Sequence, residues 1–354
     1  MKDGMFRWAR IAALVAVLAI VAAACGDDAE PADGGEATGG TTTEATGTTP
    51  AEPSEPLQVA LIAPSATNDL AFTQSMFDAL NLLADAENLE IAVSDNLFVV
   101  EDAATAIRTY ASDGYDLVIA HGSQYGGSVE EIAAEFPEVS FAWGTAGDTF
   151  GLPNVYAYQA ASDEGGYVQG VLAAGLTESK IIGVVGPIEV GDAQLYVDGF
   201  KAGVEATDPS VSVKVNYTGS FSDVALAAEA ARSFVAADSD VMTGSAQMVV
   251  GAIGVASEND VAWFGTQSNQ TSLAPEIVVA SQVYHWEVVL QQIIDGIQAG
   301  ALGGESYTID LANGGEVIEY NDAFAVPEDV KTNADAAIEG LTSGSIETGV
   351  TLVS

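Results

Sequence analysis

The chain has 354 residues, of which 51 are acidic and 9 are Lys or Arg, and its formal net charge is −42. Because so acidic a chain repels the phosphates of nucleic acids, a nucleic-acid-binding protein is excluded. Hydrophobic residues make up 48% of the sequence, which excludes disorder over most of its length and supplies enough apolar material for two lobes or domains.

The single Cys follows an N-terminal segment with the composition of an export signal. Three basic residues precede an apolar run over residues 11–24, and Cys25 comes next. The run is shorter than the roughly 20 apolar residues that a transmembrane helix needs. Its last small residues and Cys25 resemble a bacterial lipobox. We therefore expect residues 1–24 to be a lipoprotein signal peptide and Cys25 to carry a lipid anchor. The alternatives are an ordinary signal peptide with a coincidental Cys, or a retained anchor helix.

The segment after Cys25 favours lipidation. Residues 26–56 contain no large apolar side chain, so they cannot bury enough surface to offset the entropy of ordering. We expect residues 25–56 to be a disordered tether that holds a folded body at the extracytoplasmic face of the bacterial cell membrane. Without residues 1–24 the chain keeps 50 acidic and 6 basic residues. So few cations argue against a polyanionic ligand and favour a neutral or cationic small molecule.

Short apolar strands alternate with amphipathic helices from Leu57 onward. A strand over 57–63 is followed by a helix in which Phe72, Met76, Leu80 and Leu83 recur at three- or four-residue steps. The further elements predicted in this half are strands over 89–95, 116–122 and 139–144 and helices over 102–113 and 128–136. This alternation predicts a parallel sheet that is covered by helices on both faces.

The same alternation continues to the end of the chain. We predict helices over 164–176, 193–207, 223–236, 249–260, 286–299 and 328–342, and strands over 180–186, 211–218, 240–246, 261–267 and 276–283, with extended segments around Tyr307 and Val317. The two α/β halves are of comparable size and no linker of different composition separates them. The sequence therefore predicts two lobes that share several chain crossings.

Ligands of open α/β sheets bind at the carboxyl ends of the strands, so the residues that follow each predicted strand are candidates for a site. These segments are rich in amides, hydroxyls and aromatic rings and contain no Lys or Arg. This composition is typical of a site that stacks on a ring-shaped ligand and reads its hydrogen-bonding edge. The segments are 65–69, 95–96, 121–125, 145–148, 186–190, 218–221, 245–247, 267–270 and 284–286.

Six motifs in this order, together with the leader, resemble the basic membrane protein (BMP) family. They are ATNDLAFTQSMFDAL (66–80), FPEVSFAW (136–143), NVYAYQAASDEGGYVQGVLAAGL (154–176), KIIGVVG (180–186), YVDGFKAGVEATDPSVSVKVNYTGSFSD (196–223) and FGTQSNQTSLAP (264–275). Members of this family are lipoprotein receptors of ABC importers, and the best understood resemble purine-nucleoside receptors.

The resemblance extends over about residues 57–350 and implies a type I periplasmic-binding-protein fold. In this fold two doubly wound parallel-sheet lobes, joined by a hinge of three strands, clamp a ligand in the cleft between them. We divide the chain accordingly. Lobe 1 comprises 57–158 plus 285–322, and lobe 2 comprises 159–284 plus 323–354.

The resemblance also implies positions for ligand contacts. The family's Asn/Asp pair and following aromatic residue are matched by Asn68, Asp69 and Phe72, whereas Gln267 and Tyr284 stand where an acid and a lysine are usual. This paired replacement of charge by amide and aromatic groups leaves a nucleoside or a similar ring compound as the expected ligand. The ligand-binding residues that we predict are Asn68, Asp69, Phe72, Phe77, His121, Thr145, Phe221, Ser245, Gln267, Tyr284 and Trp286.

Several of these residues also have an ordinary structural interpretation. Asp69 can cap the helix that follows it, and Phe72 and Phe77, at helical spacing, can belong to the core. His121, at a strand end, can simply satisfy a nearby carbonyl. The aromatic run at 284–286 has no obvious core pattern, which favours a ligand contact for at least one of its residues.

We expect a solute receptor rather than an enzyme. Cys25 lies in the leader and cannot be a nucleophile, and no G-x-S-x-G motif precedes either His. One Cys and two His also leave little for a metal site, and we expect no cofactor. The predicted partners are a nucleoside-like solute, an ABC permease and, through Cys25, the membrane; we expect a monomer. The alternatives are a solute sensor that docks on a signalling protein and a nucleoside or glycoside hydrolase.

Overall fold

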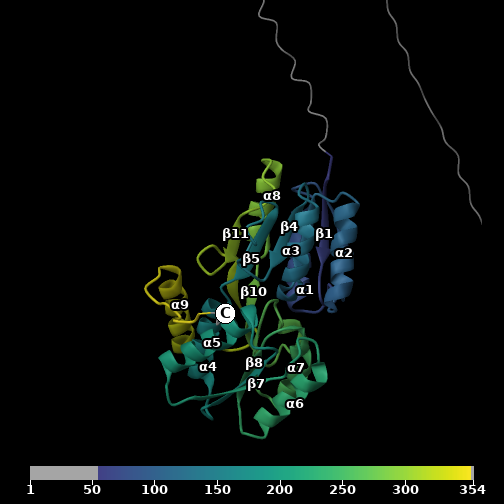
Figure 1. Cartoon of the computed structure of the whole chain (residues 1–354). Helices are drawn as coiled ribbons and strands as arrows, with labels where there is room; N and C mark the ends of the chain where they lie inside the picture. The colour runs from purple at the N-terminus through teal and green to yellow at the C-terminus, as the bar shows by residue number, and fades with distance from the viewer. Residues whose placement is uncertain (1–54, 352–354) are drawn as a thin grey trace, which may run out of the picture. The chain divides into compact units, whose positions relative to one another are not determined.

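The structure of the protein is a computed structural model that describes residues 55–351 (Figure 1). The predicted signal peptide, Cys25 and all but the last two residues of the predicted tether lie outside the described residues. None of the helices within residues 55–351 combines the length and the apolar character needed to cross a membrane.

One six-stranded sheet, with four helices packed around it, forms what we call the first lobe. Its strand order is β11-β5-β4-β3-β1-β2, and all neighbouring strands are parallel. The strands are β1 (Leu57–Ile62), β2 (Leu89–Ser94), β3 (Leu117–His121), β4 (Ser140–Gly144), β5 (Val155–Ala160) and β11 (Ser306–Ile309). The helices are α1 (Phe72–Ala84), α2 (Val100–Ser112), α3 (Gly126–Glu135) and α8 (Glu287–Gln298), and a 3₁₀ turn, η1 (Ser123–Tyr125), precedes α3.

A second six-stranded sheet forms the second lobe. Its order is β12-β10-β9-β8-β6-β7, and only the β10–β12 pair is antiparallel. The strands are β6 (Ile181–Gly186), β7 (Ser212–Tyr217), β8 (Val241–Gly244), β9 (Ala262–Gly265), β10 (Val278–Tyr284) and β12 (Glu316–Tyr320). The helices are α4 (Ser162–Leu176), α5 (Gly191–Thr207), α6 (Val224–Val235), α7 (Val250–Glu258) and α9 (Glu328–Thr342), with 3₁₀ turns η2 (Gln247–Val249) and η3 (Thr271–Leu273).

Burial on both faces explains the apolar runs in the strands. In β1, Val59 and Leu61 belong to the core on one face of the first sheet, while Ala60 and Ile62 belong to the core on the other face. All four are fully buried. Side chains of a strand alternate between its faces, so only an uninterrupted apolar run fills two cores at once. The predicted α/β class with two doubly wound, parallel-sheet lobes is confirmed.

The predicted strands and helices occur within a few residues of their expected positions, with one omission. The predicted strands include none between residues 144 and 164, whereas the structure contains β5 there, pairing with β4 and β11. The sheets also bear on one detail of the predicted lobes. The strand β12 falls in the segment 285–322 assigned to lobe 1, yet it pairs with β10 of the second sheet. The lobe ranges as a whole stay a prediction.

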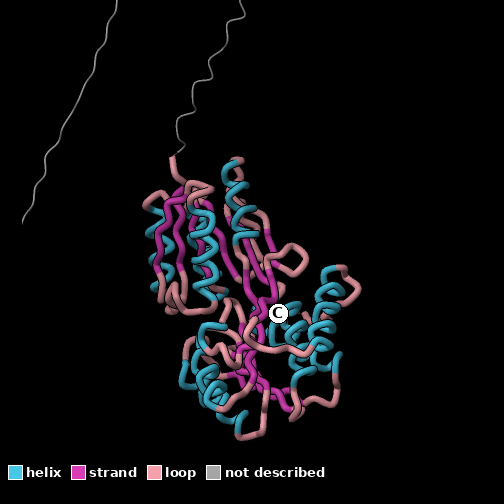
Figure 2. The backbone as a smooth tube through the Cα atoms, turned by 180° about the vertical axis from the view of Figure 1, so that it is seen from behind, coloured by secondary structure: helices cyan, strands magenta, loops and turns pink. Residues whose placement is uncertain are grey.

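The chain passes between the lobes three times, after β5, after β10 and between β11 and β12. Figure 2 shows strands of the two lobes meeting at this junction. Hydrogen bonds join the crossings. The hydroxyls of Tyr284 and Ser162 are 2.7 Å apart, Gln282 Nε2 donates to the Ser162 carbonyl at 3.1 Å, and the Gly165 amide donates to Glu316 Oε1 at 2.8 Å. The three crossings are thus linked to one another at the base of the two lobes.

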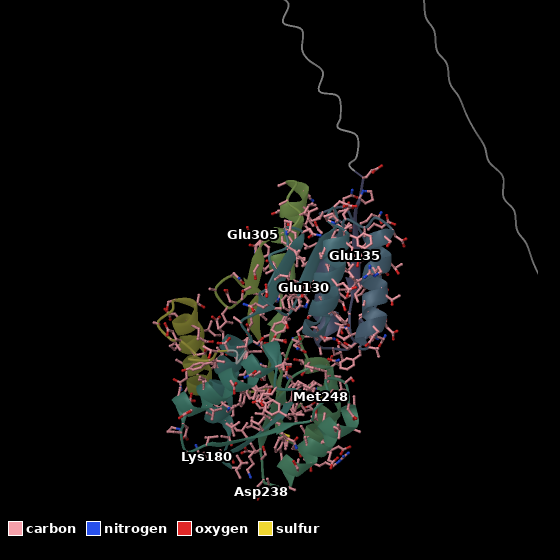
Figure 3. The ribbon with its side chains drawn as sticks, in the orientation of Figure 1. Glu130, Glu135, Lys180, Asp238, Met248 and Glu305 are labelled. Atoms are coloured by element: carbon pink, nitrogen blue, oxygen red, sulfur yellow. The ribbon has the colours of Figure 1, made fainter. Side chains whose placement is uncertain are left out.

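Many acidic side chains lie on the outside of the described body. Glu130, Glu135 and Glu305 are exposed on the first lobe, where Figure 3 labels them. Several basic side chains bind nearby acids: Arg108 binds Glu131 and Glu135, and in the second lobe Lys180 binds Asp208 at 2.6 Å. Solvated groups at the surface therefore carry much of the negative charge, whereas the side chain of Glu316 is buried.

Candidate ligand-binding site

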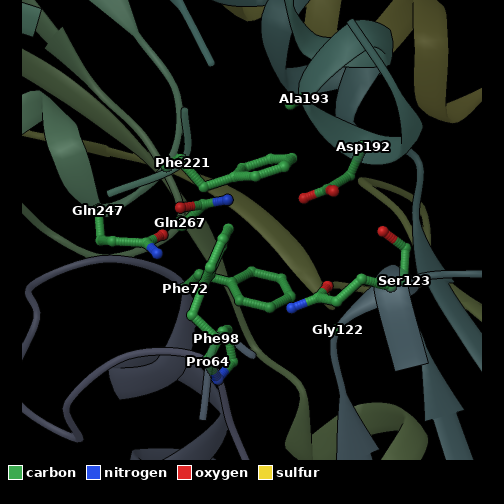
Figure 4. A pocket seen from close by; sticks show the side chains of 12 residues that line it. Pro64, Phe72, Phe98, Gly122, Ser123, Asp192, Ala193, Phe221, Gln247 and Gln267 are labelled. Atoms are coloured by element: carbon green, nitrogen blue, oxygen red, sulfur yellow. The ribbon is translucent and has the colours of Figure 1, made fainter. Parts of the chain in front are cut away.

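A cavity lies between the lobes, and its wall is built from segments that follow the strands (Figure 4). The parallel strands of each sheet end at the same edge, so their connecting segments gather there. The first lobe contributes Pro64, Phe72, Phe98, Gly122, Ser123 and Gln124, and the second contributes Asp192, Ala193, Phe221, Ala246, Gln247 and Gln267. Segments from both lobes thus meet at one cavity.

Phe72 presents an aromatic face to the cavity from the start of α1. Its ring stacks on the ring of His121, with centroids 3.9 Å apart and planes inclined by 11°. His121 Nε2 donates to the Phe72 carbonyl at 3.2 Å, and Nδ1 accepts from the Tyr158 hydroxyl at 2.8 Å. Burial lowers the pKa of His121 to about 3, because desolvation disfavours the imidazolium. His121 is therefore a neutral support behind Phe72.

Phe221 and Phe98 approach each other from different lobes. Phe221 lies in the loop between β7 and α6, and Phe98 lies between β2 and α2. Their ring centroids are 6.4 Å apart and the rings are tilted by 53°. Phe98 is 42% exposed, so this side of the cavity borders on solvent. A contact of this kind breaks when the lobes separate and forms when they close.

Asp192, in the first turn of α5, reaches the cavity from the second lobe. Its Oδ1 accepts a hydrogen bond of 3.0 Å from Thr145 Oγ1, which follows β4 in the first lobe. Burial raises the pKa of the Asp192 carboxyl, and hydrogen bonds from Thr145 and Gln267 oppose that shift. The bond between Thr145 and Asp192 joins the two lobes beside the cavity.

Two acceptor atoms at the cavity have no protein partner. Asp192 Oδ2 and Gln267 Oε1 are both inaccessible to solvent and both lack a hydrogen bond. A buried acceptor without a donor costs free energy, and native structures pair such atoms with protein, water or ligand. Figure 4 shows the carboxylate of Asp192, the amide of Gln267 and the ring of Phe221 around a common space. The arrangement can receive a flat molecule that carries hydrogen-bond donors.

A family model described as "Bmp: ABC transporter substrate-binding protein PnrA-like" matches residues 57–341. The chain belongs to the Bmp family. The resemblance seen in the sequence is thereby confirmed, and with it the broad role of a substrate-binding protein of an ABC transporter.

Relatives and solved structures agree with membership of the Bmp family. The chain is 26% identical over 292 residues to a purine-binding protein of Brucella abortus (strain 2308), covering 82% of each chain. It is 24% identical over 307 residues to the ABC transporter nucleoside-binding protein BmpA of Lactococcus lactis subsp. cremoris (strain MG1363), covering 80% of this chain and 87% of that one. A solved solute-binding protein of an ABC transporter system from Conexibacter woesei DSM 14684 superimposes with a TM-score of 0.69 and 27% identity, covering 82% of this chain and 98% of that one.

Three of the eleven residues predicted for the Bmp-type site line the cavity: Phe72, Phe221 and Gln267. Thr145 lies behind the wall and holds Asp192. The side chain of Asn68 is exposed and outside the lining. The ligand roles predicted for all eleven residues stay predictions.

Asp69 caps α1. Its carboxylate accepts hydrogen bonds from the backbone amides of Thr73 and Gln74, each at 3.1 Å, and from Ser65 Oγ at 2.6 Å. These are the amides that the first turn of a helix leaves without an intrahelical partner. The capping interpretation therefore describes what Asp69 does in this structure, where it does not line the cavity.

The remaining predicted residues lie in the protein interior. Trp286 is 0% exposed, its Nε1 donates to Ser75 Oγ at 3.0 Å, and its ring meets those of His121 and Tyr284 edge-on. Tyr284 and Phe77 pack in the same core as Trp286. Ser245 is buried in the second lobe and its amide donates to the Val185 carbonyl at 3.2 Å. None of them lines the cavity.

Five lining residues lie outside the segments that the strand-end rule selected: Pro64, Phe72, Phe98, Asp192 and Ala193. Of these, Phe72 was predicted from the family resemblance. Asp192 and Ala193 follow the selected segment 186–190 by two or three residues. The signal that could have found them is the start of α5, because the first turn of a helix after a strand faces the same edge as the loop. Among residues 55–351 no group of three or more His, Cys, Asp or Glu is arranged to hold a metal ion.

Proposed function

We propose that this protein is an extracytoplasmic substrate-binding lipoprotein that binds a nucleoside or a similar ring-containing small molecule between its lobes and delivers it to an ABC permease. In this proposal the protein acts as a monomer, binds without catalysis and is anchored to the cell membrane through a lipid on Cys25. The observation that carries the proposal is the pair Phe72 and Phe221, which approach one cavity from different lobes.

The cavity offers a nucleoside two kinds of contact. The rings of Phe72 and Phe221 provide apolar faces for a base, and stacked aromatic pairs are favourable beyond the area that they bury. Asp192 Oδ2 and Gln267 Oε1 are unpaired acceptors of two residues that line this cavity, and they suit N–H or O–H donors of a base or sugar. A ligand that touches both lobes binds most tightly when they are closed, so ligand binding favours the closed state.

The relatives support this ligand class. One is named a purine-binding protein and another a nucleoside-binding protein of an ABC transporter, and each is matched over about four-fifths of its length. Both names describe ring compounds that bear hydrogen-bond donors. The ligand class is carried to this chain by the shared family together with the aromatic and acceptor groups of its own cavity.

The N-terminal sequence supports the anchor. A signal-like segment ends at Cys25 and a long polar segment follows, which is the order expected of a lipoprotein with a flexible tether. A tethered receptor stays close to its permease, and this raises the effective concentration of the closed, loaded form at the transporter. Mass spectrometry of the membrane fraction tests the anchor. We expect residues 1–24 to be absent and Cys25 to carry acyl chains, and an unmodified Cys25 contradicts this part of the proposal.

Calorimetric titration of the purified body with purine and pyrimidine nucleosides, free bases and pentoses tests the ligand class. We expect heat of binding with at least one nucleoside, and a loss of roughly 1–3 kcal/mol of binding free energy in Phe221→Ala, as for removal of a buried aromatic contact. Phe324→Ala is the matched control, since Phe324 is a half-buried ring of the second lobe that packs in the core away from the cavity. Binding of no ring compound, or equal affinity in Phe221→Ala and the native protein, contradicts the proposal.

A further inference from the structure

The proposed function uses Asp192 as a hydrogen-bond acceptor but leaves the negative charge of this residue unexplained. Gln267 stands on the cavity wall where the family resemblance implies an acid, and its amide brings no charge there. Asp192 adds a carboxylate next to Gln267, and no Lys or Arg lines the cavity. The cavity therefore contains an anionic group with no positive charge in its own wall.

The rest of the described chain supplies no counter-ion either. The ion pairs within residues 55–351 join Arg108, Lys180, Lys201, Lys331 and His285 to other acids, and none of them involves Asp192. The groups that do approach the carboxylate are neutral donors: Thr145 Oγ1, the side chain of Gln267, and the backbone amides of Asp192 and Ala193. A carboxylate withdrawn from water without a cation is strongly disfavoured, and a bound cation relieves that cost.

Three aromatic rings border the same space. Phe72, Phe98 and Phe221 line the cavity together with Asp192, from both lobes. The face of an aromatic ring carries partial negative charge and attracts a cation, most strongly where water is excluded. A carboxylate with one free oxygen and three ring faces is the combination that binds ammonium groups and protonated or alkylated ring nitrogens.

From this juxtaposition we propose that Asp192 is a ligand-binding residue and that it selects ligands with a positively charged nitrogen, such as a cationic nitrogen heterocycle or its nucleoside. In the proposed complex, the free Oδ2 atom of Asp192 pairs with the positively charged nitrogen, and Gln267 Oε1 accepts a hydrogen bond from a second donor. The Phe rings cover the faces of the heterocycle. The inference rests on the proposed function for the nucleoside part of the ligand, but not for its charge.

A matched pair of ligands separates charge from shape. 1-Methyladenosine is a cation at neutral pH, and N6-methyladenosine is a neutral isomer with the same added methyl group. We expect the native protein to bind 1-methyladenosine at least about tenfold more tightly in calorimetric titration, the size expected for a hydrogen bond to a charged group. In Asp192→Asn, which keeps the size of the side chain and an acceptor for Thr145, we expect the two affinities to become equal.

Asp198→Asn is the control variant, because Asp198 is on the same helix but pairs with Lys201 outside the cavity. It should leave the preference unchanged. Equal affinity of the two isomers for the native protein, or an unchanged preference in Asp192→Asn, overturns the inference. An equal loss for both isomers in Asp192→Asn also overturns it, since Asp192 then contacts the ligand without reading its charge.

A second pair keeps the test valid if no nucleoside binds. Nicotinamide and 1-methylnicotinamide are single rings that differ by one methyl group and one positive charge. If only 1-methylnicotinamide raises the melting temperature, and Asp192→Asn abolishes that rise, the inference stands while the nucleoside part of the proposed function fails. If neither nucleosides nor 1-methylnicotinamide bind, both fail. If nucleosides bind but neither pair shows a preference for the cation, the proposed function stands and the inference fails.

Discussion

The two walls of the cavity differ in how their polar groups are satisfied. On the first lobe, Phe72 rests on His121, whose two ring nitrogens are both hydrogen-bonded, and on a packed interior that includes Trp286. On the second lobe, Asp192 and Gln267 each present a buried oxygen without a partner. The polar groups of the first wall are thus paired within the protein, whereas two acceptors of the second wall are unpaired, and in our proposal the ligand pairs them. Changes to the first should act on stability, and changes to the second on affinity.

The largest expected effect breaks the support of the first wall. Trp286→Ala removes a fully buried ring and leaves Ser75 Oγ without its indole donor, so we expect a loss of about 3–5 kcal/mol of unfolding free energy. Denaturant unfolding followed by fluorescence or circular dichroism measures it, and Trp286→Phe, which keeps one ring, should lose less. A variant as stable as the native protein shows that the first wall does not depend on this interior, and the contrast between the walls is then wrong.

The next effect comes from His121 and depends on pH. Burial lowers the pKa of His121 to about 3 in the folded protein, while an unfolded His titrates near 6.5. The unfolded state therefore binds a proton that the folded state does not bind. As a result, the contribution of His121 to the free energy of unfolding falls as pH drops from about 6.5 toward 3. Between pH 7 and pH 5 the native protein should lose roughly 2 kcal/mol relative to His121→Gln.

His285 provides a control of opposite sign. Its hydrogen bond to Glu287 raises the pKa of His285, so its contribution is present at low pH and is lost as pH rises through the folded pKa. Unfolding measured at several pH values should show His121→Gln and His285→Gln deviating from the native protein in opposite directions. Parallel pH profiles of the native protein and His121→Gln contradict the assignment of a neutral, buried His121.

A third change tests the second wall. Gln267→Met keeps the length of the side chain but removes Oε1, the open acceptor, and the donor beside Asp192. We expect ligand affinity to fall about tenfold while the melting temperature stays within a few degrees, because the lost oxygen has no partner in the protein. Titration and thermal unfolding of the same preparation decide the point. A large loss of stability with unchanged affinity places Gln267 with the structural residues of the first wall.

The contrast between the walls also explains how far sequence reasoning reached. Local patterns predicted α9 correctly as 328–342, because Pro327 marks its start and its apolar residues recur at helical spacing. The strand-end rule selected Phe221 and Gln267, because their position follows from local alternation of strands and helices. It also selected Trp286, whose ring packs in the core instead. There the indole N–H donates to Ser75, which is 211 residues earlier in the sequence. Such distant partners decide whether an aromatic ring points toward the cavity or into the core.

Asp192 shows the same limit of local patterns, here for a residue that they did not select. Nothing within its own helix distinguishes it from an ordinary acidic residue near a helix N-terminus, a position that favours negative charge. Its importance at the cavity arises because the segment after β6 meets Thr145 of the other lobe, and that contact spans 47 residues. The omission of β5 is related, since its pairing with β11 joins segments about 150 residues apart. Contacts of this range are set by packing of whole lobes rather than by local propensity.

The smallest predicted effect tests the hydrogen bond between Thr145 and Asp192, which is one of several that join the two lobes. Thr145→Val keeps the shape of the side chain but removes the donor to Asp192 Oδ1. If this bond helps to orient the carboxylate and to hold the lobes closed, ligand affinity should fall by about 1 kcal/mol, the net value of a typical hydrogen bond, with little change in the association rate and a faster dissociation. Thr105→Val, on the exposed face of α2, is the control. Stopped-flow experiments measure both the association and the dissociation rate. If only the association rate changes, Thr145 acts before the lobes close, and the two walls are not coupled through Asp192.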